Sequence, residues 1–490
     1  MNILLLYPEF PDTFWSFKHA LKFIGKKASN PPLGLITIAA LLPVNWQKRL
    51  VDTNVQQLTQ KDIEWADMVM ISAMVVQRES THELIGRCKA VDKTVVAGGP
   101  LFTGEYQDFP LVDHFILNEG EITLPMFLDD WALGAARHIY QTNEFANIQK
   151  SPAPLWNLLD LKQYATMSLQ FSRGCPFDCE FCNVTALLGH RPRTKTAKQL
   201  ITELNGLFAL GWRDAIFLVD DNFIGNKKII KQELLPALIE WQKDKNGLPF
   251  STEASINMAD DPELMNLMVK AGFNSVFIGI ETPNDDSLIE CNKKQNRHRN
   301  LVESVNRIQQ AGMMVQGGFI VGFDSDTEQI FEQQADFIQK ASITTAMIGL
   351  LQAPAGTRLY KRLIGEGRLL GEMTGDNADG STNIIPHLDI QFLKAGYSKL
   401  IKQLYQPKEY YQRCLTLLKT IKTPKIKHTI DPSYIMAFFR SIYLLGIKGV
   451  ERTEYWKLFL WTLVNKPKLF PQAITLAIYG YHFRILAERV

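Results

Sequence analysis

Residues 171–182 read FSRGCPFDCEFC and directly follow a predicted strand over residues 167–172. Cys175, Cys179 and Cys182 stand at a C-x3-C-x2-C spacing, and thiolates so spaced can bind three irons of one cubane cluster from a compact loop. Because ordinary electron-transfer clusters take four cysteines, this set leaves one iron open to a further ligand. A structural zinc site, which prefers four ligands in C-x2-C pairs, is the alternative.

A series of six short apolar segments surrounds and follows this loop. Helical segments separate them, and six strand-plus-helix units in a row predict a (β/α)6 partial barrel over about residues 161–385. Polar or Gly-rich clusters follow nearly every strand, so one shared catalytic mouth is expected. The predicted strands cover residues 167–172, 214–219, 249–254, 275–280, 315–321 and 345–350.

An earlier series of strands precedes the barrel, separated from it by a linker over residues 141–160. Alternation of buried strands with helices predicts a doubly wound, Rossmann-like domain over about residues 1–140. Gly- and Pro-rich segments follow its strands, where ligands bind in this architecture. The strands are predicted at 2–7, 49–51, 67–73, 94–97 and 113–117, and the segments are PPLG at 31–34, GGP at 98–100 and NEGE at 118–121.

From about residue 386 to 490 the pattern is helical, aromatic and basic. Residues 401–490 hold 15 Lys+Arg against 5 Asp+Glu, whereas the whole chain holds 53 against 51. No nucleic-acid partner is expected, because the chain has no overall positive field. Aromatic and basic residues at helical spacing predict peripheral contact with a membrane, with core packing as the alternative. The aromatic residues are Tyr434, Phe438, Phe439, Tyr443, Trp456, Phe459 and Trp461.

Composition bounds the class of protein. The chain has 490 residues, of which 46% are hydrophobic and 21% charged, which excludes a small binding module and a disordered chain. Six cysteines are too few for a disulfide framework and indicate a reducing compartment. The N-terminus lacks the features of a secretory signal, and no apolar window is long enough to span a bilayer. A cytoplasmic protein is expected, peripheral to the membrane if the C-terminal helices contact it.

The cysteine motif on a barrel strand resembles the signature of the radical S-adenosylmethionine (SAM) enzymes, and later strand ends extend the resemblance. It implies that a 4Fe–4S cluster bound by the three cysteines cleaves SAM to a 5′-deoxyadenosyl radical. Phe181 matches an aromatic position near the adenine. Asp220 and Asp221 match the motif that holds the methionine amino group, with a helix N-cap pair as the alternative.

Three further strands carry resemblances to SAM contacts. Glu281 in FIGIET matches the polar residue that meets the SAM ribose, and Glu253 on the preceding strand is a weaker candidate. Gly317 and Gly318 match a Gly-rich strand, where missing side chains let a ligand approach, although simple strand packing also accounts for them.

The first 140 residues resemble the cobalamin-binding domain of a large subgroup of these enzymes. The resemblance implies that the loops after the strands contact cobalamin through Gly98, Gly99, Pro100, Glu119 and Gly120. The D-x-H-x-x-G motif, which would supply a lower axial His, is absent, because the chain after the first strand runs YPEFPDTFWSFKH. No His ligand to cobalt is therefore expected, and a vestigial domain without cofactor is the alternative.

Over nearly its full length the chain resembles the hopanoid 2-methylase family and its uncharacterised relatives. The residues that carry this are the cysteine motif, FLVDDNFIGN at 217–226, FIGIETP at 277–283, KKQN at 293–296 and YWKLFLW at 455–461. The resemblance implies a cobalamin-dependent C-methyltransferase that acts on an unactivated carbon of a lipid or other apolar small molecule. A reductase, flavodoxin or ferredoxin would supply electrons, and no protein general base is assigned. A radical cyclisation, oxidation or ring rearrangement without methyl transfer, and a non-catalytic iron–sulfur scaffold, are the alternatives.

Overall fold

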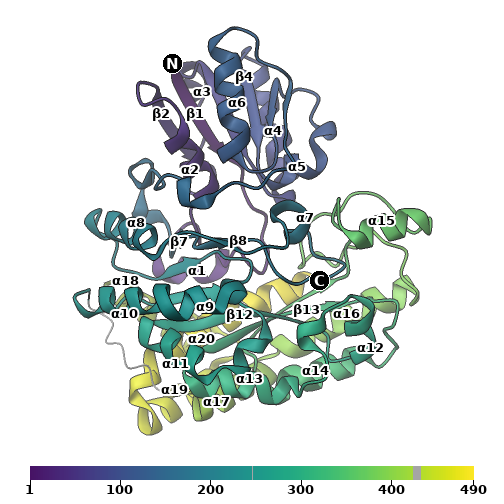
Figure 1. Cartoon of the computed structure of the whole chain (residues 1–490). Helices are drawn as coiled ribbons and strands as arrows, with labels where there is room; N and C mark the ends of the chain where they lie inside the picture. The colour runs from purple at the N-terminus through teal and green to yellow at the C-terminus, as the bar shows by residue number, and fades with distance from the viewer. Residues whose placement is uncertain (246, 423–431) are drawn as a thin grey trace.

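The computed structural model describes residues 1–245, 247–422 and 432–490, except for the side chains of residues 432 and 433. An N-terminal α/β unit lies against the open end of a second, larger α/β unit, and the C-terminal helices pack behind the latter (Figure 1). The predicted α/β fold, with a Rossmann-like unit, a partial barrel and a helical C-terminal part, is confirmed.

The first sheet is parallel throughout, with strand order β2-β1-β3-β4-β5-β6. Its chain order reverses between β1 and β3, and the crevice beyond such a switch point is where doubly wound sheets bind ligands. The short last strand, β6, was not predicted from the sequence. The strands are β1 (Asn2–Tyr7), β2 (Gln47–Asp52), β3 (Met68–Ser72), β4 (Thr94–Gly98), β5 (His114–Ile116) and β6 (Ile139–Tyr140).

Helices cover both faces of this sheet, as the nearly continuous apolar strands require. They are α2 (Leu33–Leu41), α3 (Gln60–Trp65), α4 (Arg78–Lys89), α5 (Pro100–Glu105) and α6 (Gly120–Ala132). Helix α1 (Lys18–Ile24) departs from this layer: it packs against helices α18 and α20 of the C-terminal part. The N-terminal segment thereby joins the two ends of the chain.

The second sheet has the six parallel strands of the predicted partial barrel, in the order β14-β13-β12-β11-β10-β7. In β13, buried residues alternate with partly buried ones, which places one set against the outer helices and the other in the barrel interior. The strands are β7 (Met167–Leu169), β10 (Ile216–Leu218), β11 (Phe250–Glu253), β12 (Phe273–Glu281), β13 (Met314–Val321) and β14 (Thr345–Leu350).

Helices follow the barrel strands on the outside. They are α8 (Ala197–Ala209), α9 (Lys227–Ile229) continuing through a π-turn into α10 (Leu235–Lys243), α11 (Pro262–Ala271), α12 (Asp285–Glu290), α13 (Leu301–Ala311), α14 (Ile330–Lys340) and α15 (Arg358–Gly365). A short helix, α7 (Val184–Leu188), and the hairpin of β8 (Ser172–Arg173) with β9 (Arg193–Thr194) follow the first strand.

The C-terminal part is helical, as predicted. Its last helix packs against α16, α17 and α19 as well as α1, so its buried side chains continue the core of the barrel. The helices are α16 (Ile390–Tyr405), α17 (Pro407–Thr420), α18 (Pro432–Ser441) with a π-helical extension (Ile442–Lys448), α19 (Arg452–Asn465) and α20 (Phe470–Arg489). Among the described residues, no helix is both long and apolar enough to cross a membrane.

Candidate functional site

The three motif cysteines lie on the loop that follows β8. Cys179 is buried, and Cys175 and Cys182 are half-buried. Burial raises the pKa of Cys182 to about 12 and also raises the pKa of Cys175. Without a metal these two thiols are protonated at neutral pH, and metal binding must release their protons.

Amide side chains approach two of the cysteine sulfurs. Asn222 Nδ2 lies 3.8 Å from Cys175 Sγ, and Gln295 Nε2 lies 3.7 Å from Cys179 Sγ. Donors aimed at thiolate sulfurs stabilise the negative charge of a bound iron–sulfur cluster and shift its reduction potential. Neither residue was assigned to the site from the sequence, although Gln295 belongs to the KKQN segment.

The spacing of the sulfurs favours a cluster over a single zinc ion. Zn–S bonds of about 2.3 Å in a tetrahedral site bring the sulfurs to within about 4 Å of one another. In the described part of the chain, only Glu105, Asp108 and Glu372 form a group with all ligand atoms within 4.8 Å, and no cysteine belongs to it. At least one pair of the three cysteine sulfurs is therefore more than 4.8 Å apart, which suits ligands on different irons of a cubane better than ligands of one zinc ion.

Helix α15 clamps the cluster loop from outside. Arg362 Nε donates to Glu180 Oε1 over 2.9 Å, and Arg358 donates to the carbonyl of Asp178 over 2.6 Å. The backbone N–H of Leu359 donates to the carbonyl of Glu180. Residues between the first and third cysteines are therefore held by a helix that follows the last barrel strand.

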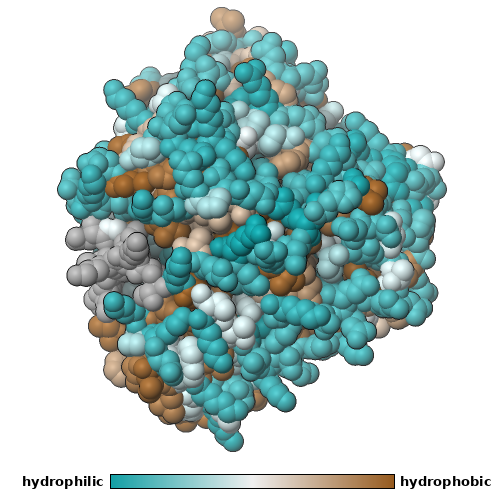
Figure 2. Space-filling model, turned by 60° about the horizontal axis from the view of Figure 1, so that its bottom comes forward, coloured by the Kyte–Doolittle hydropathy of each residue, from teal (hydrophilic) through white to brown (hydrophobic). Residues whose placement is uncertain are grey.

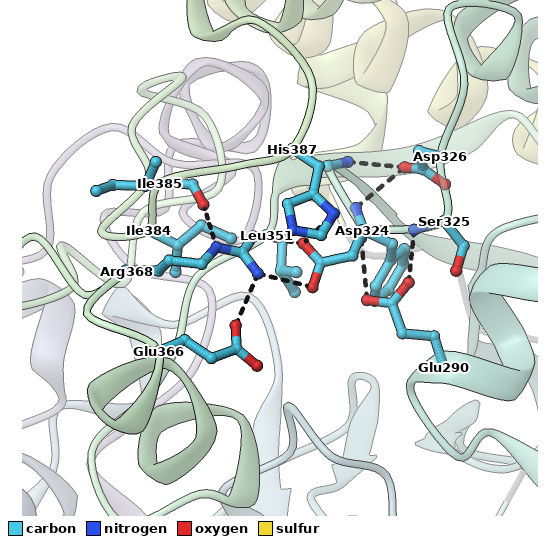
Figure 3. A network of polar contacts seen from close by, with 12 residues as sticks. Glu290, Asp324, Ser325, Asp326, Leu351, Glu366, Arg368, Ile384, Ile385 and His387 are labelled. Atoms are coloured by element: carbon cyan, nitrogen blue, oxygen red, sulfur yellow. Dashed lines mark hydrogen bonds and ion pairs between the residues drawn. The ribbon is translucent and has the colours of Figure 1, made fainter.

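A polar network around Asp324 fixes that helix to the loop after β13, and Figure 3 shows the part of the network that contains Arg368, Glu366 and Glu290. Asp324 accepts hydrogen bonds from Arg362 (2.9 Å) and Arg368 (3.0 Å), and Arg368 also pairs with Glu366. Glu290 accepts from the backbone N–H groups of Asp324 and Ser325, which orients the loop. The network therefore fixes the position of α15, and α15 in turn holds the cluster loop.

Asp220 and Asp221 have different hydrogen-bond partners and therefore different roles. Asp220 is fully buried and accepts hydrogen bonds from the backbone N–H groups of Phe171 and Ser172 and from Ser172 Oγ. Its carboxylate therefore positions the start of the cluster loop. The buried Oδ2 of Asp221 has no hydrogen-bond partner among the described residues, which leaves an acceptor for a ligand. Neither caps a helix, since the next helical turn begins after Asn222 without a side-chain cap.

A third acid, Glu253, closes this group at the end of β11. Burial and the neighbouring carboxylates of Asp221 and Asp220 raise the pKa of Glu253 to about 8. Burial likewise raises the pKa of Asp220 to about 7 and that of Asp221 to about 6. A cationic ligand group beside these three acids would favour their ionised forms and would itself be stabilised by them.

Glu281 stands on a β-bulge at the end of β12. The register with β13 shifts between Gly279 and Glu281, and Glu281 has φ 64°. A left-handed conformation is strained for a non-glycine residue, and bulges beside active sites re-aim side chains. The Glu281 carboxylate pairs with Lys293 Nζ at 2.5 Å, and both side chains are buried.

Lys293 lies between this carboxylate and the cluster loop. Its Nζ is 5.8 Å from the centre of the Phe181 ring, and Glu281 and the cysteines Cys179 and Cys182 raise the pKa of Lys293 against the effect of burial. The site therefore contains a fixed positive charge beside the cluster ligands. This residue was not predicted as functional.

The glycines of β13 are in close contact with aromatic rings. A Cβ at Gly318 would come within 2.8 Å of Phe277, and one at Gly317 within 2.7 Å of Phe319. Gly318 is paired with Gly279 in the neighbouring strand, on the interior side that also carries Phe277. Strand packing accounts for Gly317, whereas Gly318 lies beside the interior.

The loops of the first sheet face the cluster hairpin. Glu119 is buried and pairs with Arg193 at 2.6 Å and Arg173 at 3.1 Å, and Arg173 also pairs with Glu121. Glu119 thus joins the N-terminal unit to the barrel. Gly120, at the start of α6, packs against Ile38.

The loop after β4 packs closely against the ends of the neighbouring strands β3 and β5. Gly99 has φ 96°, and a Cβ there would come within 2.6 Å of Ser72 Oγ. Gly98 approaches the carbonyl of Ile116 equally closely, and Pro100 begins α5. Only glycine lets the backbone pass here, at the carboxyl edge where this fold binds its ligands.

Comparisons with known proteins agree with this geometry. Residues 169–338 match the model of the radical SAM superfamily, and residues 357–490 match a domain of unknown function, DUF4070. An uncharacterized methyltransferase of Synechocystis sp. is 41% identical over 99% of this chain and 91% of its own length. The hopanoid C-2 methylase of Rhodopseudomonas palustris is 34% identical over 95% of this chain and 90% of its own length.

The chain belongs to the radical SAM methyltransferases related to the hopanoid C-2 methylase. The predicted family, the enzymatic activity and the dependence of this radical SAM methyltransferase on a 4Fe–4S cluster and SAM are confirmed. Enzymes of this kind act on small molecules and need an electron donor.

The fold has a counterpart that spans this radical SAM methyltransferase from end to end. A structure of the cobalamin-dependent SAM radical enzyme OxsB, with aqua-cobalamin and SAM bound, covers 100% of this chain and 80% of its own, with a TM-score of 0.63 and 14% identity. This likeness shows that the two proteins share their fold. The matched domain of unknown function begins at Thr357, the N-cap residue of α15, so it includes the helix that clamps the cluster loop.

Proposed function

We propose that the protein transfers a methyl group to an unactivated carbon of an apolar small molecule, with cobalamin as methyl carrier. When bound, the cluster and SAM supply a 5′-deoxyadenosyl radical that removes a hydrogen atom from the substrate, and cobalamin supplies the methyl group. A flavodoxin, a ferredoxin or a reductase is the proposed electron donor. The substrate class follows from the hopanoid C-2 methylase, a relative over nearly the whole chain.

The observation that carries this proposal is the locked contact between the two units. The ion pairs of Glu119 and Glu121 with Arg173 and Arg193 hold the loops of the first sheet against the hairpin that carries the cysteines. Radical methylation needs the substrate, the radical and the methyl donor in one water-poor chamber. A cofactor cradled at Gly98, Gly99 and Pro100 would border that chamber.

The residues of the barrel have roles that follow from their contacts. Cys175, Cys179 and Cys182 would bind the cluster, and Asn222 and Gln295 would donate to its sulfur ligands. We assign Phe181, Asp221, Glu253, Glu281 and Gly318 to the surroundings of SAM, while Asp220 positions the loop. Lys293 orients Glu281 and places a positive charge beside the cluster.

The decisive experiment measures both SAM products. Reconstituted enzyme, supplied with cobalamin, reductant and a hopanoid under anaerobic conditions, should form S-adenosylhomocysteine and 5′-deoxyadenosine in step with a methylated product. Deoxyadenosine with a rearranged or oxidised product, and no S-adenosylhomocysteine, would replace methyl transfer by a radical cyclase or oxidoreductase. Absence of deoxyadenosine would leave only an iron–sulfur scaffold.

We also propose that the protein is cytoplasmic and touches the membrane through an exposed apolar face on α18, its π-helical extension and α19. The structure divides the predicted aromatic residues: Phe438, Trp456, Phe459 and Trp461 pack against the core, whereas Tyr434, Phe439 and Tyr443 are exposed, with the Tyr434 hydroxyl donating to Asp214. Further exposed apolar side chains join them, namely Ile435, Met436, Ile447, Val450, Leu460, Leu463 and Val464. A hydrophobic region is visible at the lower left edge of the molecule in Figure 2.

Basic residues accompany this apolar face. Lys448 lies over the ring of Tyr443, and Lys466 and Lys468 follow α19. Apolar side chains accompanied by lysines match an anionic bilayer surface, whereas in a two-fold dimer the lysines would repel one another. An apolar substrate partitions into the membrane, so contact with the bilayer brings the enzyme to its substrate.

Sedimentation with anionic vesicles tests this contact. The variant Phe439→Asp/Leu463→Asp should lose binding, while the control Leu133→Asp should retain it because Leu133, although 81% exposed, lies on the N-terminal unit. Equal binding by all three proteins would reject the face as the membrane contact.

A further inference from the structure

Trp15 lies in the segment that leaves the switch point of the first sheet. This segment, residues 8–17, follows β1 and takes the place of the D-x-H-x-x-G motif that is absent from the sequence. It does not remain at the edge of the N-terminal sheet but reaches the barrel, since the ring of Trp15 lies 4.8 Å from the ring of Phe277 on β12. The segment thus connects the two places where ligands are expected.

The neighbours of Trp15 fix its position. Phe14 is buried against Phe483 of α20, and Phe17 packs against Tyr479, His482 and Phe483 of the same helix. Phe17 adopts a left-handed conformation, with φ 48°, and hydrogen bonds between Thr13 and Ser16 close the turn. Strained backbone of this kind persists where surrounding packing over-determines it, so Trp15 is held rather than mobile.

Trp15 nevertheless remains 39% exposed, although the ring of Phe14 is buried and that of Phe17 is half-buried. An amphipathic ring held at the mouth of an enzyme chamber is a rigid contact surface that loses little conformational entropy when a ligand covers it. Its partner Phe277 is paired in register with Glu253 on one side and Gln316 on the other. Trp15 therefore enters the barrel at the level of the acids assigned to SAM.

Two glycines lie between Phe277 and the proposed SAM contacts. The ring of Phe277 lies against Gly318, which is paired with Gly279, and the next functional side chain along β12 is Glu281. An apolar surface thus begins at Trp15 and ends beside the proposed SAM contacts. Two polar side chains border Phe277 in the paired strands: Glu253, which favours its neutral form, and Gln316, which is uncharged.

We propose that Trp15 and Phe277 form an apolar seat for the substrate, which holds a fused-ring or long hydrocarbon skeleton between the SAM site and the carboxyl edge of the first sheet. The substrate class assigned to this seat rests on the proposed function. Its place explains why the segment after β1 carries an aromatic residue where a cobalt ligand would otherwise stand: the loop serves the substrate instead.

Two separate measurements, of hopanoid binding and of SAM cleavage, test the seat. The first measurement is equilibrium binding of a radiolabelled hopanoid hydrocarbon carried in cyclodextrin, with cluster-loaded enzyme. Trp15→Ala should raise its Kd at least about tenfold, and Trp15→Phe should restore most of the affinity. The control Trp65→Phe, on α3 and packed over Arg49, should bind as the wild type does. Urea midpoints and cluster absorbance of Trp15→Ala should match those of the wild type.

The second measurement distinguishes the seat from the proposed function. Trp15→Ala should still release deoxyadenosine from SAM and reductant, with a raised KM for the hopanoid in any product assay. Hopanoid binding that depends on Trp15, without formation of S-adenosylhomocysteine, would support the seat and reject methyl transfer. Equal affinity of the wild type and Trp15→Ala, or no hopanoid binding by the wild type, would overturn the seat.

Discussion

Lys293 Nζ and Glu281 Oε1 lie 2.5 Å apart inside the barrel, between the cluster loop and the end of β12. The two residues are twelve positions apart, and the bulge that gives Glu281 its left-handed φ turns its carboxylate toward the lysine. Gly279 makes the pair possible, because a Cβ at that position would collide with both charged groups. The pair places a counter-charge for the thiolates at a position set by the backbone.

Lys293→Met should lower both stability and radical formation. It leaves the buried Glu281 carboxylate unpaired, at a cost of about 3–5 kcal/mol in the free energy of unfolding. SAM cleavage should fall at least about tenfold, because the positive charge beside the cluster is gone. The double variant Glu281→Gln/Lys293→Met should regain much of the stability but not the cleavage rate. Urea unfolding and deoxyadenosine release measure the two effects, and wild-type values in the single variant would contradict the assignment.

Each of the three motif cysteines should be required for cluster assembly. Cys175→Ala, Cys179→Ala and Cys182→Ala should each lose iron–sulfur absorbance and deoxyadenosine formation, because a cubane short of one ligand does not assemble stably. Cys88→Ala is the matched control, since Cys88 is buried in the core of the first sheet. A Cys88→Ala protein without cluster would refute the ligand set.

Arg362→Ala should loosen the cluster loop without unfolding the barrel. The guanidinium joins Glu180 of the loop to Asp324 of the network, and charge-assisted hydrogen bonds of this kind contribute about 1.5–3 kcal/mol each. We expect the reconstituted cluster to be lost faster on exposure to air, followed by absorbance. Arg307→Ala, which removes only an exposed pair with Glu303, should behave as the wild type. Equal rates of loss in both variants would show that α15 does not clamp the loop.

Stability of the cofactor-free protein should fall as the pH rises from about 4.5 to about 8. The pKa of Glu253 is about 8 in the fold, above its usual value, so the folded state binds more protons over this window and loses that advantage on ionisation. Glu253→Gln should therefore raise the free energy of unfolding by up to about 5 kcal/mol at a pH of about 8.5 and change it little at about 5. Urea titrations at both values measure this, and a gain independent of pH would contradict it.

Part of this site could be predicted from local sequence. The spacing of Cys175, Cys179 and Cys182 identifies the cluster loop, since all three ligands lie within one short loop. Asp221 and Glu281 stay predicted SAM contacts: their resemblance to family motifs suggested them, and parallel strands bring their carboxyl ends to one edge. Asn222, Gln295 and Arg362 were not predicted because each contacts a partner distant in sequence, and Lys293 was not predicted because its contact with Glu281 depends on the bulge in β12.

Two roles changed once the packing was known. Glu119 was predicted as a cofactor contact from its loop, but its carboxylate is occupied by Arg173 and Arg193 of the barrel. Asp220 was predicted to hold SAM, but its oxygens accept the hydrogen bonds of the cluster loop. A carboxylate can serve either as a cofactor contact or as a structural acceptor. Only the position of the hydrogen-bond donors around Glu119 and Asp220 shows which role each of them has.

The sequence by itself determined the order of the units and the six strands of the barrel, and it predicts the cluster ligands, because hydrophobic periodicity and cysteine spacing are local properties of the chain. Only the tertiary structure decided that the segment after β1 carries Trp15 to Phe277, that α1 packs on α20, and that α15 holds the cluster loop. These contacts join segments hundreds of residues apart. They depend on side-chain packing and charge pairing between elements, which the local pattern of either partner does not encode.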